Sequence, residues 1–277
     1  MRTPSGATRV AGVIGDPVRH SLSPVLHNTA YRELGLDWVY VAFEVPDGAA
    51  RGALEAMRVL GIAGLSVTMP HKTAVAAACD SLAPDAAALH SVNTVTLEPD
   101  DRLAGDSTDG EGFMRSLHDA GCDPAGVAAV VLGAGGAARA VAHALGAAGA
   151  KVTVCARRGE AAATAAGLAG GTVVAWDDRA DAVAAATLVV NATPVGMGGE
   201  GLPVDAAAFQ AGQVLADLVY HPIETALLAA ARDRGVRTVD GLGMLVHQAG
   251  LQVERWTGVD APIAAMAAAA RAALAAR

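Results

Sequence analysis

The chain has 277 residues, a hydrophobic fraction of 53% that is inflated by alanine, and a formal net charge of −8. At roughly 100–200 residues per domain, this length predicts one large domain or two ordinary ones. The acidic balance and the lack of any run rich in Lys and Arg argue against nucleic acid and acidic lipid as partners.

Residues 1–8 contain no apolar segment of the kind found in signal peptides. The alanine-rich tail from Ala261 is too weakly hydrophobic to span a bilayer. Cys79, Cys122 and Cys155 are far apart in the sequence, which is typical of buried thiols in a reducing compartment. We therefore expect a cytoplasmic protein with no membrane association, either a monomer or a homodimer.

The first hundred residues alternate predicted strands with predicted helices. Branched or alternating apolar runs predict strands at residues 9–15, 39–45, 64–69 and 91–97, the last ending in a turn at 98–101. Helices are expected at about 24–34, 47–60 and 71–79, the first with Ser23 as its N-cap and Pro24 as its first residue. This alternation implies an α/β domain with a mostly parallel sheet.

A predicted helix at residues 110–120 leads into a second series of strands. These strands are expected at 127–132, 151–156, 172–175, 188–191, 214–219 and 236–239, the number required for two βαβαβ halves. The helical tail from about Leu242 has no strand left to accompany, so we expect it to return to the first domain. The sequence thus predicts an α/β protein of two domains. Residues 1–109 plus 242–277 form the substrate domain, and residues 110–241 form a Rossmann-type, doubly wound dinucleotide-binding domain.

A Gly-rich turn separates the strand at 127–132 from an alanine-rich helix. Gly133, Gly135 and Ala138 match the small positions of the pattern G-x-G-x-x-G/A. Gly133 permits a sharp turn, Gly135 lets backbone N–H groups approach a pyrophosphate, and the N–H groups at the helix start favour an anion. The pattern predicts a dinucleotide site over Gly133, Ala134, Gly135, Gly136, Ala137 and Ala138. A merely tight turn is the alternative.

The strand after this turn indicates the coenzyme. About 20 residues beyond the turn, NAD sites carry an Asp or Glu that binds the ribose 2′-hydroxyl, whereas this chain has Arg157 and Arg158. Two guanidinium groups suit the 2′-phosphate of NADP in charge and geometry. We therefore expect NADP. NAD remains the alternative because Glu160 lies nearby, and two exposed arginines at a turn are the structural alternative.

Uncharged hydroxyl and amide groups predominate at the carboxyl ends of the predicted strands, where open α/β sheets bind their ligands. They belong to Ser21, Ser23, Thr68, Asn93, Thr94, Ser107, Thr108, Asn191, Thr193 and Tyr220. Such groups suit a small polyhydroxylated substrate. Ser21 and Ser23 are candidates to bind a carboxylate beside the helix start, and a role for Ser23 as a helix cap alone is the alternative.

Lys72 is one of only two lysines, although the chain has 20 Lys and Arg residues together. A lysine can release a proton near neutral pH when it is desolvated, and an arginine cannot. Lys72 is therefore a candidate acid–base residue, against the alternative of a surface lysine at a helix start. Asp109 is its natural counterpart, against the alternative that it caps the helix near Gly110.

Metal and nucleophilic chemistry find no support in the sequence. The eight histidines show no metal-ligand spacing, so we expect no metal. His20 and His71 lie beside the expected pocket, and we assign neither as a ligand or base. Cysteine nucleophiles and Ser-His-Asp triads also lack support.

Taken together, the motifs of this chain resemble the shikimate dehydrogenase family. They run in order from about residue 13 to residue 248, as Ser21–Asn28, Ser66–Lys72, Asn93-Thr94, Thr108–Gly110, Gly133–Ala138, Asn191–Met197, Asp217–Pro222 and Asp240–Gln248. The family reduces 3-dehydroshikimate to shikimate with NADPH, reversibly, in aromatic amino-acid biosynthesis. Each motif alone is unspecific, but their combination is highly specific.

The resemblance implies a role for each matching residue. Lys72 and Asp109 would be the catalytic pair and would also touch the substrate. The remaining substrate contacts would come from Ser21, Ser23, Thr68, Asn93, Tyr220 and Gln248. Gly133 to Ala138 would hold the pyrophosphate, and Arg157 and Arg158 would face the adenosine phosphate. The nicotinamide side would be lined by Thr193, Leu218 and Gly241.

Two positions depart from the family pattern. Ala156 stands where the family usually has Asn, which affects adenosine contacts, and Ser107 replaces an Asn before Thr108. The pair Ser21 and Ser23 resembles shikimate-specific members more than quinate-using ones. The alternatives are an NAD-linked quinate/shikimate or aminoshikimate dehydrogenase, and a non-catalytic nucleotide-sensing relative.

Overall fold

The computed structural model describes residues 3–199 and 201–276. The chain divides into two compact units, one formed by Met1–Thr108 and Gln248–Arg277 and the other by Asp109–His247. The bounds predicted from the sequence, at residues 109/110 and 241/242, lie close to these divisions. The second division differs because helix α10 (Gly241–Thr257) continues unbroken through it. In the described part of the chain, no helix is long and apolar enough to cross a lipid bilayer.

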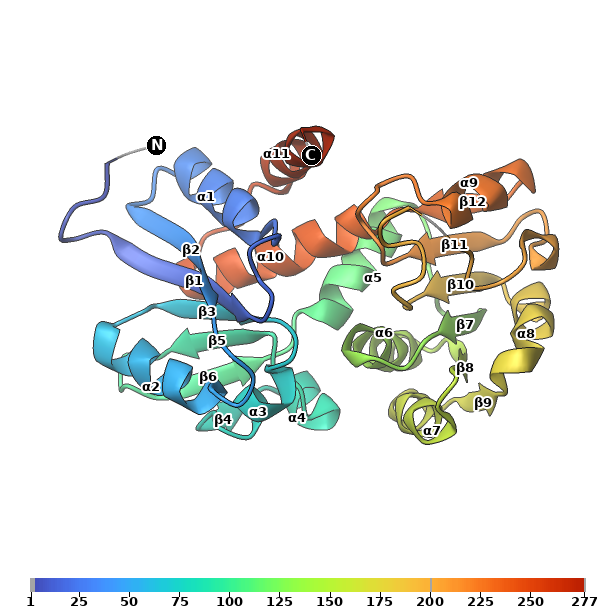
Figure 1. The fold of residues 1–277 in the computed structure, drawn as a ribbon, viewed down its shortest axis with the longest axis horizontal. Helices are drawn as coiled ribbons and strands as arrows, with labels where there is room; N and C mark the ends of the chain where they lie inside the picture. The colour runs from blue at the N-terminus through green and yellow to red at the C-terminus, as the bar shows by residue number, and fades with distance from the viewer. Residues whose placement is uncertain (1–2, 200, 277) are drawn as a thin grey trace. The chain divides into compact units, whose positions relative to one another are not determined.

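The first unit is built on a six-stranded sheet in the order β2-β1-β3-β5-β6-β4. Its strands are β1 (Arg9–Gly15), β2 (Trp38–Glu44), β3 (Gly64–Val67), β4 (Ser81–Leu82), β5 (Thr94–Leu97) and β6 (Leu103–Asp106). Its helices are α1 (Ser23–Glu33), α2 (Ala50–Leu60), α3 (Lys72–Ala76), α4 (Pro84–Leu89), α11 (Ile263–Ala275) and the end of α10. In Figure 1, α1 and α11 lie on one face of this sheet and α2 and α3 on the other.

The expected parallel pairing is present at β1, which is parallel to both β2 and β3. β5, in contrast, is antiparallel to β3 and β6. β5 and β6 are joined by a turn in which the Glu98 N–H donates to the Arg102 carbonyl at 2.9 Å and Asp101 has a φ of 63°. So short a connection permits only antiparallel pairing. The sequence predicted this turn but not β4, β6 or α4.

The core of the first unit explains the spacing of apolar residues in α2. Leu54 and Met57 are three residues apart on one helix face, and both are buried against Ile14 and Leu65 of the sheet. Burying a side chain of this size stabilises the fold by about 1.5–3 kcal/mol. Gly61 then ends the helix in the left-handed region, with a φ of 64°.

The second unit has six strands that are all parallel, in the order β12-β11-β10-β7-β8-β9. This is the strand order of the doubly wound dinucleotide-binding fold, as predicted. The strands are β7 (Ala128–Leu132), β8 (Lys151–Cys155), β9 (Thr172–Val174), β10 (Leu188–Asn191), β11 (Val214–Asp217) and β12 (Arg237–Val239). The helices are α5 (Asp109–Asp119), α6 (Gly136–Ala147), α7 (Gly159–Leu168), α8 (Arg179–Ala185), α9 (Ala226–Asp233) and the start of α10.

Alternate residues of β7 face two separate cores, because successive side chains of a strand point to opposite faces. Ala129 and Val131 pack in the cluster that contains α5, α6 and α7. Val130 and Leu132 pack in the cluster that contains α8 and α9. Covering both faces with helices explains why the strand is a continuous apolar run.

Candidate functional site

The Gly-rich turn has the geometry of a dinucleotide cradle. Gly133 has a φ of +112°, and a Cβ there would stand 2.8 Å from the Ala192 carbonyl oxygen, so only glycine fits. Gly135 and Gly136 are exposed, and a Cβ on either would meet no atom within 4 Å. Gly135 caps α6 without a side-chain hydrogen bond, so the helix start is open to an anion from outside the chain. Ala138 is fully buried in the core.

Arg157 and Arg158 follow β8 after one residue, Ala156, and β8 is hydrogen-bonded to β7. Both are exposed, and Arg158 is the N-cap of α7. The strand end therefore offers two guanidinium groups beside the strand that leads into the Gly-rich turn. This donor set fits the 2′-phosphate of NADP, which requires positive charge and several N–H donors.

A buried carboxylate organises the loops after β10 and β11. Asp217 accepts hydrogen bonds from Asn191 Nδ2 at 2.8 Å, the Val219 N–H at 3.1 Å and Thr225 Oγ1 at 2.7 Å. Asn191 Oδ1 in turn accepts from the N–H and the hydroxyl of Thr193, at 3.1 and 2.7 Å. Burial raises the pKa of Asp217, although these three donors oppose the shift. The network holds Thr193 in place and fixes the backbone at Val219, the residue after Leu218.

Three further predicted residues belong to the second unit. Tyr220 is half-buried in the segment after β11. Gly241 is buried as the first residue of α10. Asp109 belongs to the second unit as the first residue of α5, where it is 9% exposed.

In the first unit, Ser21 and Ser23 lie together at the start of α1. The Ser21 hydroxyl donates to Ser23 Oγ at 3.2 Å, and Ser21 Oγ also accepts from the Ser23 N–H at 3.2 Å. The predicted cap at Ser23 was wrong, since the N-cap is Leu22 and no side chain caps the helix. Ser23 already lies inside the first turn of α1, so its hydroxyl does not cap the start of the helix.

Thr68 and Lys72 follow β3 in a short segment that turns into α3. The Thr68 N–H donates to the Ile14 carbonyl at 3.0 Å, which extends the pairing of β3 with β1. Lys72 begins α3 and is half-buried, and its carbonyl oxygen accepts from the Val92 N–H at 3.0 Å. The backbone of both residues is therefore anchored to neighbouring elements.

Asn93, Thr108 and Gln248 form one buried group in the first unit. Asn93 Oδ1 accepts from the Thr108 N–H at 2.8 Å, and Asn93 Nδ2 donates to Thr108 Oγ1 at 3.0 Å. The Thr108 hydroxyl donates a hydrogen bond to the backbone carbonyl oxygen of Gln248 at 3.2 Å. The structure thus brings two of the expected substrate contacts, Asn93 and Gln248, to a shared partner.

Three polar residues that support this site were not predicted from the sequence: Thr225, Ser66 and Gln252. A signal existed for two of them. Ser66 interrupts the apolar strand β3, and Gln252 lies four residues after Gln248, on the same face of α10. Thr225 gave no signal because it binds Asp217 from a loop eight residues farther along the chain.

His71 is held by a hydrogen-bonding contact with the backbone of the first unit. Its Nε2 lies 2.8 Å from the Val45 carbonyl oxygen, and the side chain is buried. Within residues 3–199 and 201–276, no group of three His, Cys, Asp or Glu residues is arranged to hold a metal ion.

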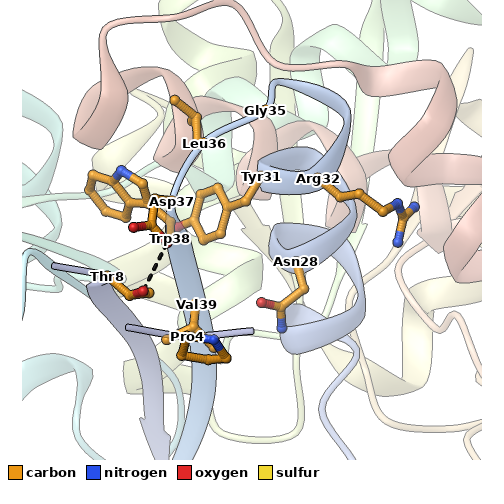
Figure 2. A pocket seen from close by; sticks show the side chains of 10 residues that line it. All are labelled: Pro4, Thr8, Asn28, Tyr31, Arg32, Gly35, Leu36, Asp37, Trp38 and Val39. Atoms are coloured by element: carbon orange, nitrogen blue, oxygen red, sulfur yellow. Dashed lines mark hydrogen bonds between the residues drawn. The ribbon is translucent and has the colours of Figure 1, made fainter. Parts of the chain in front are cut away.

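A cavity of about 380 Å³ in the first unit lies away from these residues. Figure 2 shows residues that line it, among them Tyr31 of α1, whose ring points toward Trp38 of β2. None of the predicted site residues lines this cavity, so it is not the candidate active site.

Comparison with known proteins agrees with the motifs. Residues 13–95 match the family model of the shikimate dehydrogenase substrate binding domain, and residues 241–271 match that of the shikimate 5'-dehydrogenase C-terminal domain. The shikimate dehydrogenase (NADP(+)) of Moorella thermoacetica is 44% identical over 94% of this chain and 92% of that protein.

Solved structures give the same result. The shikimate 5-dehydrogenase of Thermus thermophilus in complex with NADP(H) and shikimate has a TM-score of 0.89 and 38% identity, over 96% of this chain and all of that one. The quinate dehydrogenase of Corynebacterium glutamicum in complex with NAD has a TM-score of 0.89 and 32% identity, over 96% of this chain and 99% of that one. At these levels of identity and coverage, the chain belongs to the shikimate dehydrogenase family.

Proposed function

We propose that this chain catalyses the reversible, NADPH-dependent reduction of 3-dehydroshikimate to shikimate. One observation carries most of the proposal: the similarity to NADP-dependent shikimate dehydrogenases extends over nearly the whole chain. The open Gly-rich turn and the two arginines after β8 support NADP as the coenzyme. The hydroxyl and amide groups of the first unit suit a substrate with several hydroxyls.

Lys72 is the proposed acid–base residue. NADPH, when bound, supplies the hydride for the reduction. Lys72 donates a proton to the oxygen of the carbonyl group as that oxygen becomes a hydroxyl, and it takes the proton back in the oxidation direction. Asp109, as a carboxylate, favours the charged form of Lys72 and orients it.

Substrate binding is assigned to polar side chains of both units. Ser21 and Ser23 offer paired hydroxyls beside the start of α1, a place where a carboxylate is stabilised. Thr68, Asn93, Tyr220 and Gln248 are proposed to bind the ring hydroxyls or the carboxylate. Thr193, Leu218 and Gly241 are proposed to line the nicotinamide side.

An NAD-linked quinate or shikimate dehydrogenase is the second candidate. It is favoured by Ala156, which departs from the Asn usual in the family and so affects the adenosine contacts, and by the likeness to a quinate dehydrogenase. The intact pair Ser21 and Ser23 and the arginines after β8 favour the first candidate.

Absorbance at 340 nm tests the proposal, with shikimate or quinate as substrate and NADP or NAD as coenzyme. We expect the highest kcat/KM for shikimate with NADP. A higher value for quinate with NAD would establish the second candidate. No turnover in any of the four combinations would contradict catalysis and favour a nucleotide-sensing role.

Two further proposals concern the state of the protein in the cell. A cytoplasmic location is supported by Cys79, Cys122 and Cys155, whose thiols are free and whose pKa values are raised by burial. We also propose a monomer or a homodimer, which light scattering after size-exclusion chromatography distinguishes.

A further inference from the structure

A continuous chain of hydrogen bonds crosses the interior of the first unit, with Gln252 at its centre. The Tyr40 hydroxyl donates to Ser66 Oγ at 2.6 Å, and the Ser66 hydroxyl donates to Gln252 Oε1 at 2.7 Å. Gln252 Nε2 donates to Thr94 Oγ1 at 3.0 Å and to the Asn93 carbonyl oxygen at 3.3 Å. Gln252 is 1% exposed, so these bonds are shielded from competing water.

At one end of this series of hydrogen bonds, the orientation of the Asn93 amide is fixed. The Thr94 hydroxyl donates to Asn93 Oδ1 at 2.8 Å, and the Thr108 N–H donates to the same oxygen at 2.8 Å. Donors on Oδ1 determine which way the amide is turned, because the nitrogen must then point to acceptors. Asn93 Nδ2 accordingly donates to Thr108 Oγ1.

The other end reaches Ser23. The ring of Tyr40 is stacked on that of His27, with centroids 4.0 Å apart. His27 Nδ1 lies 2.9 Å from the Ser23 carbonyl oxygen, which can only accept, so Nδ1 carries the proton. Burial raises the pKa of Tyr40, and hydrogen bonds with Ser66 and Ser23 oppose that shift. The series of hydrogen bonds therefore reaches, at its two ends, Asn93 and Ser23, which are both proposed to bind the substrate.

The donors run in one direction, which leaves Gln252 a single orientation. Gln252 Nε2 donates to the Asn93 carbonyl oxygen, which can only accept, so the Gln252 nitrogen must face Thr94 and the Gln252 oxygen must accept from the Ser66 hydroxyl. Thr94 then has its own hydrogen available for Asn93. We propose that Gln252 is a positioning residue for substrate recognition, acting through Thr94 to hold the amide of Asn93 in its binding orientation. This inference rests on the proposed role of Asn93.

Gln252→Met tests it, because methionine keeps the length of the side chain and removes both hydrogen-bonding groups. We expect KM for shikimate to rise about tenfold, with KM for NADP unchanged and kcat within about threefold. Gln213→Met is the matched control. Gln213 is also buried, and its Nε2 donates to the Val183 and Ala186 carbonyls at 2.7 Å in the second unit. We expect this control to lose thermal stability without a change in KM for shikimate.

Gln252→Glu gives a readout that a purely structural role would not move. An ionised carboxylate accepts from Ser66 but cannot donate to Thr94, so the Thr94 hydroxyl turns away from Asn93. Protonation at lower pH restores a donor. We therefore expect KM of this variant, relative to wild type, to rise as the pH is raised from 6 to 9.

The outcomes separate this inference from the proposed function. If the wild-type enzyme oxidises shikimate but Gln252→Met changes KM no more than Gln213→Met does, the positioning role is overturned and the function stands. If Gln252→Met fails to fold, the pH dependence of Gln252→Glu decides, and a constant KM ratio overturns the role. If the wild type turns over no shikimate, the proposed function itself fails.

Discussion

A Cβ on Gly241 would stand 2.5 Å from the carbonyl oxygen of Leu218. The first turn of α10 thus lies directly against the backbone that follows β11. The Val219 carbonyl oxygen would be almost as close, at 2.7 Å. Because both obstacles are backbone atoms, a side chain at Gly241 is accommodated only by moving the segment that carries Leu218.

Gly241→Ala is therefore expected to raise KM for NADP about tenfold and to lower Tm, with a smaller effect on KM for shikimate. Gly167→Ala is the control, because a Cβ there meets no atom within 4 Å and Gly167 lies within α7. Replacing a helical glycine by alanine stabilises by up to about 1 kcal/mol, so this control should keep its KM values and gain stability. Equal kinetics for the two variants would show that the Leu218 segment does not touch the coenzyme.

Lys72→Ala is expected to lower kcat by about 10²–10⁴ and to change KM for shikimate only a few-fold, because proton donation matters most in the transition state. The chain's other lysine supplies the control: Lys151 is exposed at the start of β8, and Lys151→Ala should leave kcat unchanged. Steady-state kinetics with shikimate and NADP measure both. A Lys72→Ala enzyme as active as wild type would refute the mechanism.

Removing Arg157 and Arg158 should change coenzyme preference. Each charge-assisted hydrogen bond to a phosphate is worth about 1.5–3 kcal/mol. One such bond corresponds to about 10–100-fold, so the double variant Arg157→Ala/Arg158→Ala should lose about 10²–10⁴-fold in kcat/KM for NADP and less than about threefold for NAD. Arg234→Ala removes an exposed charge after α9 and should alter neither value. A parallel loss for both coenzymes would mean that the arginines do not read the 2′-phosphate.

Asp217 should make stability depend on pH. Its pKa in the folded protein is raised, mainly by burial, above that of the unfolded chain. The stabilising contribution is then fully present below the unfolded pKa of about 3.9 and is lost as the pH rises through the folded pKa. Asp217→Asn does not titrate, so the Tm of wild type should fall relative to this variant as the pH is raised above about 4. A Tm difference that stays constant as the pH is raised would contradict the shift.

Sequence periodicity was enough to place the six strands of the second unit. The central strands β7, β10 and β11 are apolar runs that are almost wholly buried, and β8, β9 and β12 contain short runs of Val and Thr. The first unit was harder. β4 has two residues and β6 contains Gly105 and Asp106, so neither shows a strand pattern. Gly105 is needed because a Cβ there would stand 2.8 Å from Val92 and 2.9 Å from Cys79.

The candidate site was predictable where a residue type has a chemical reason to stand at a strand end. Lys72, Asn93 and the Gly-rich turn are of this kind. Gln252 was not predictable, because its importance depends on which buried groups surround it. Its partners Ser66 and Thr94 are more than 150 residues away in the chain, and no local pattern encodes such a meeting.

The first unit is discontinuous in sequence, so its two segments are synthesised at different times, before and after the second unit. α11 packs against α1, and the Trp256 indole N–H donates to the Val95 carbonyl at 3.2 Å. Residues 109–247 are synthesised before either partner from the C-terminal segment. The sheet of the first unit is therefore fully covered only after α11, the last helix of the chain, has been synthesised.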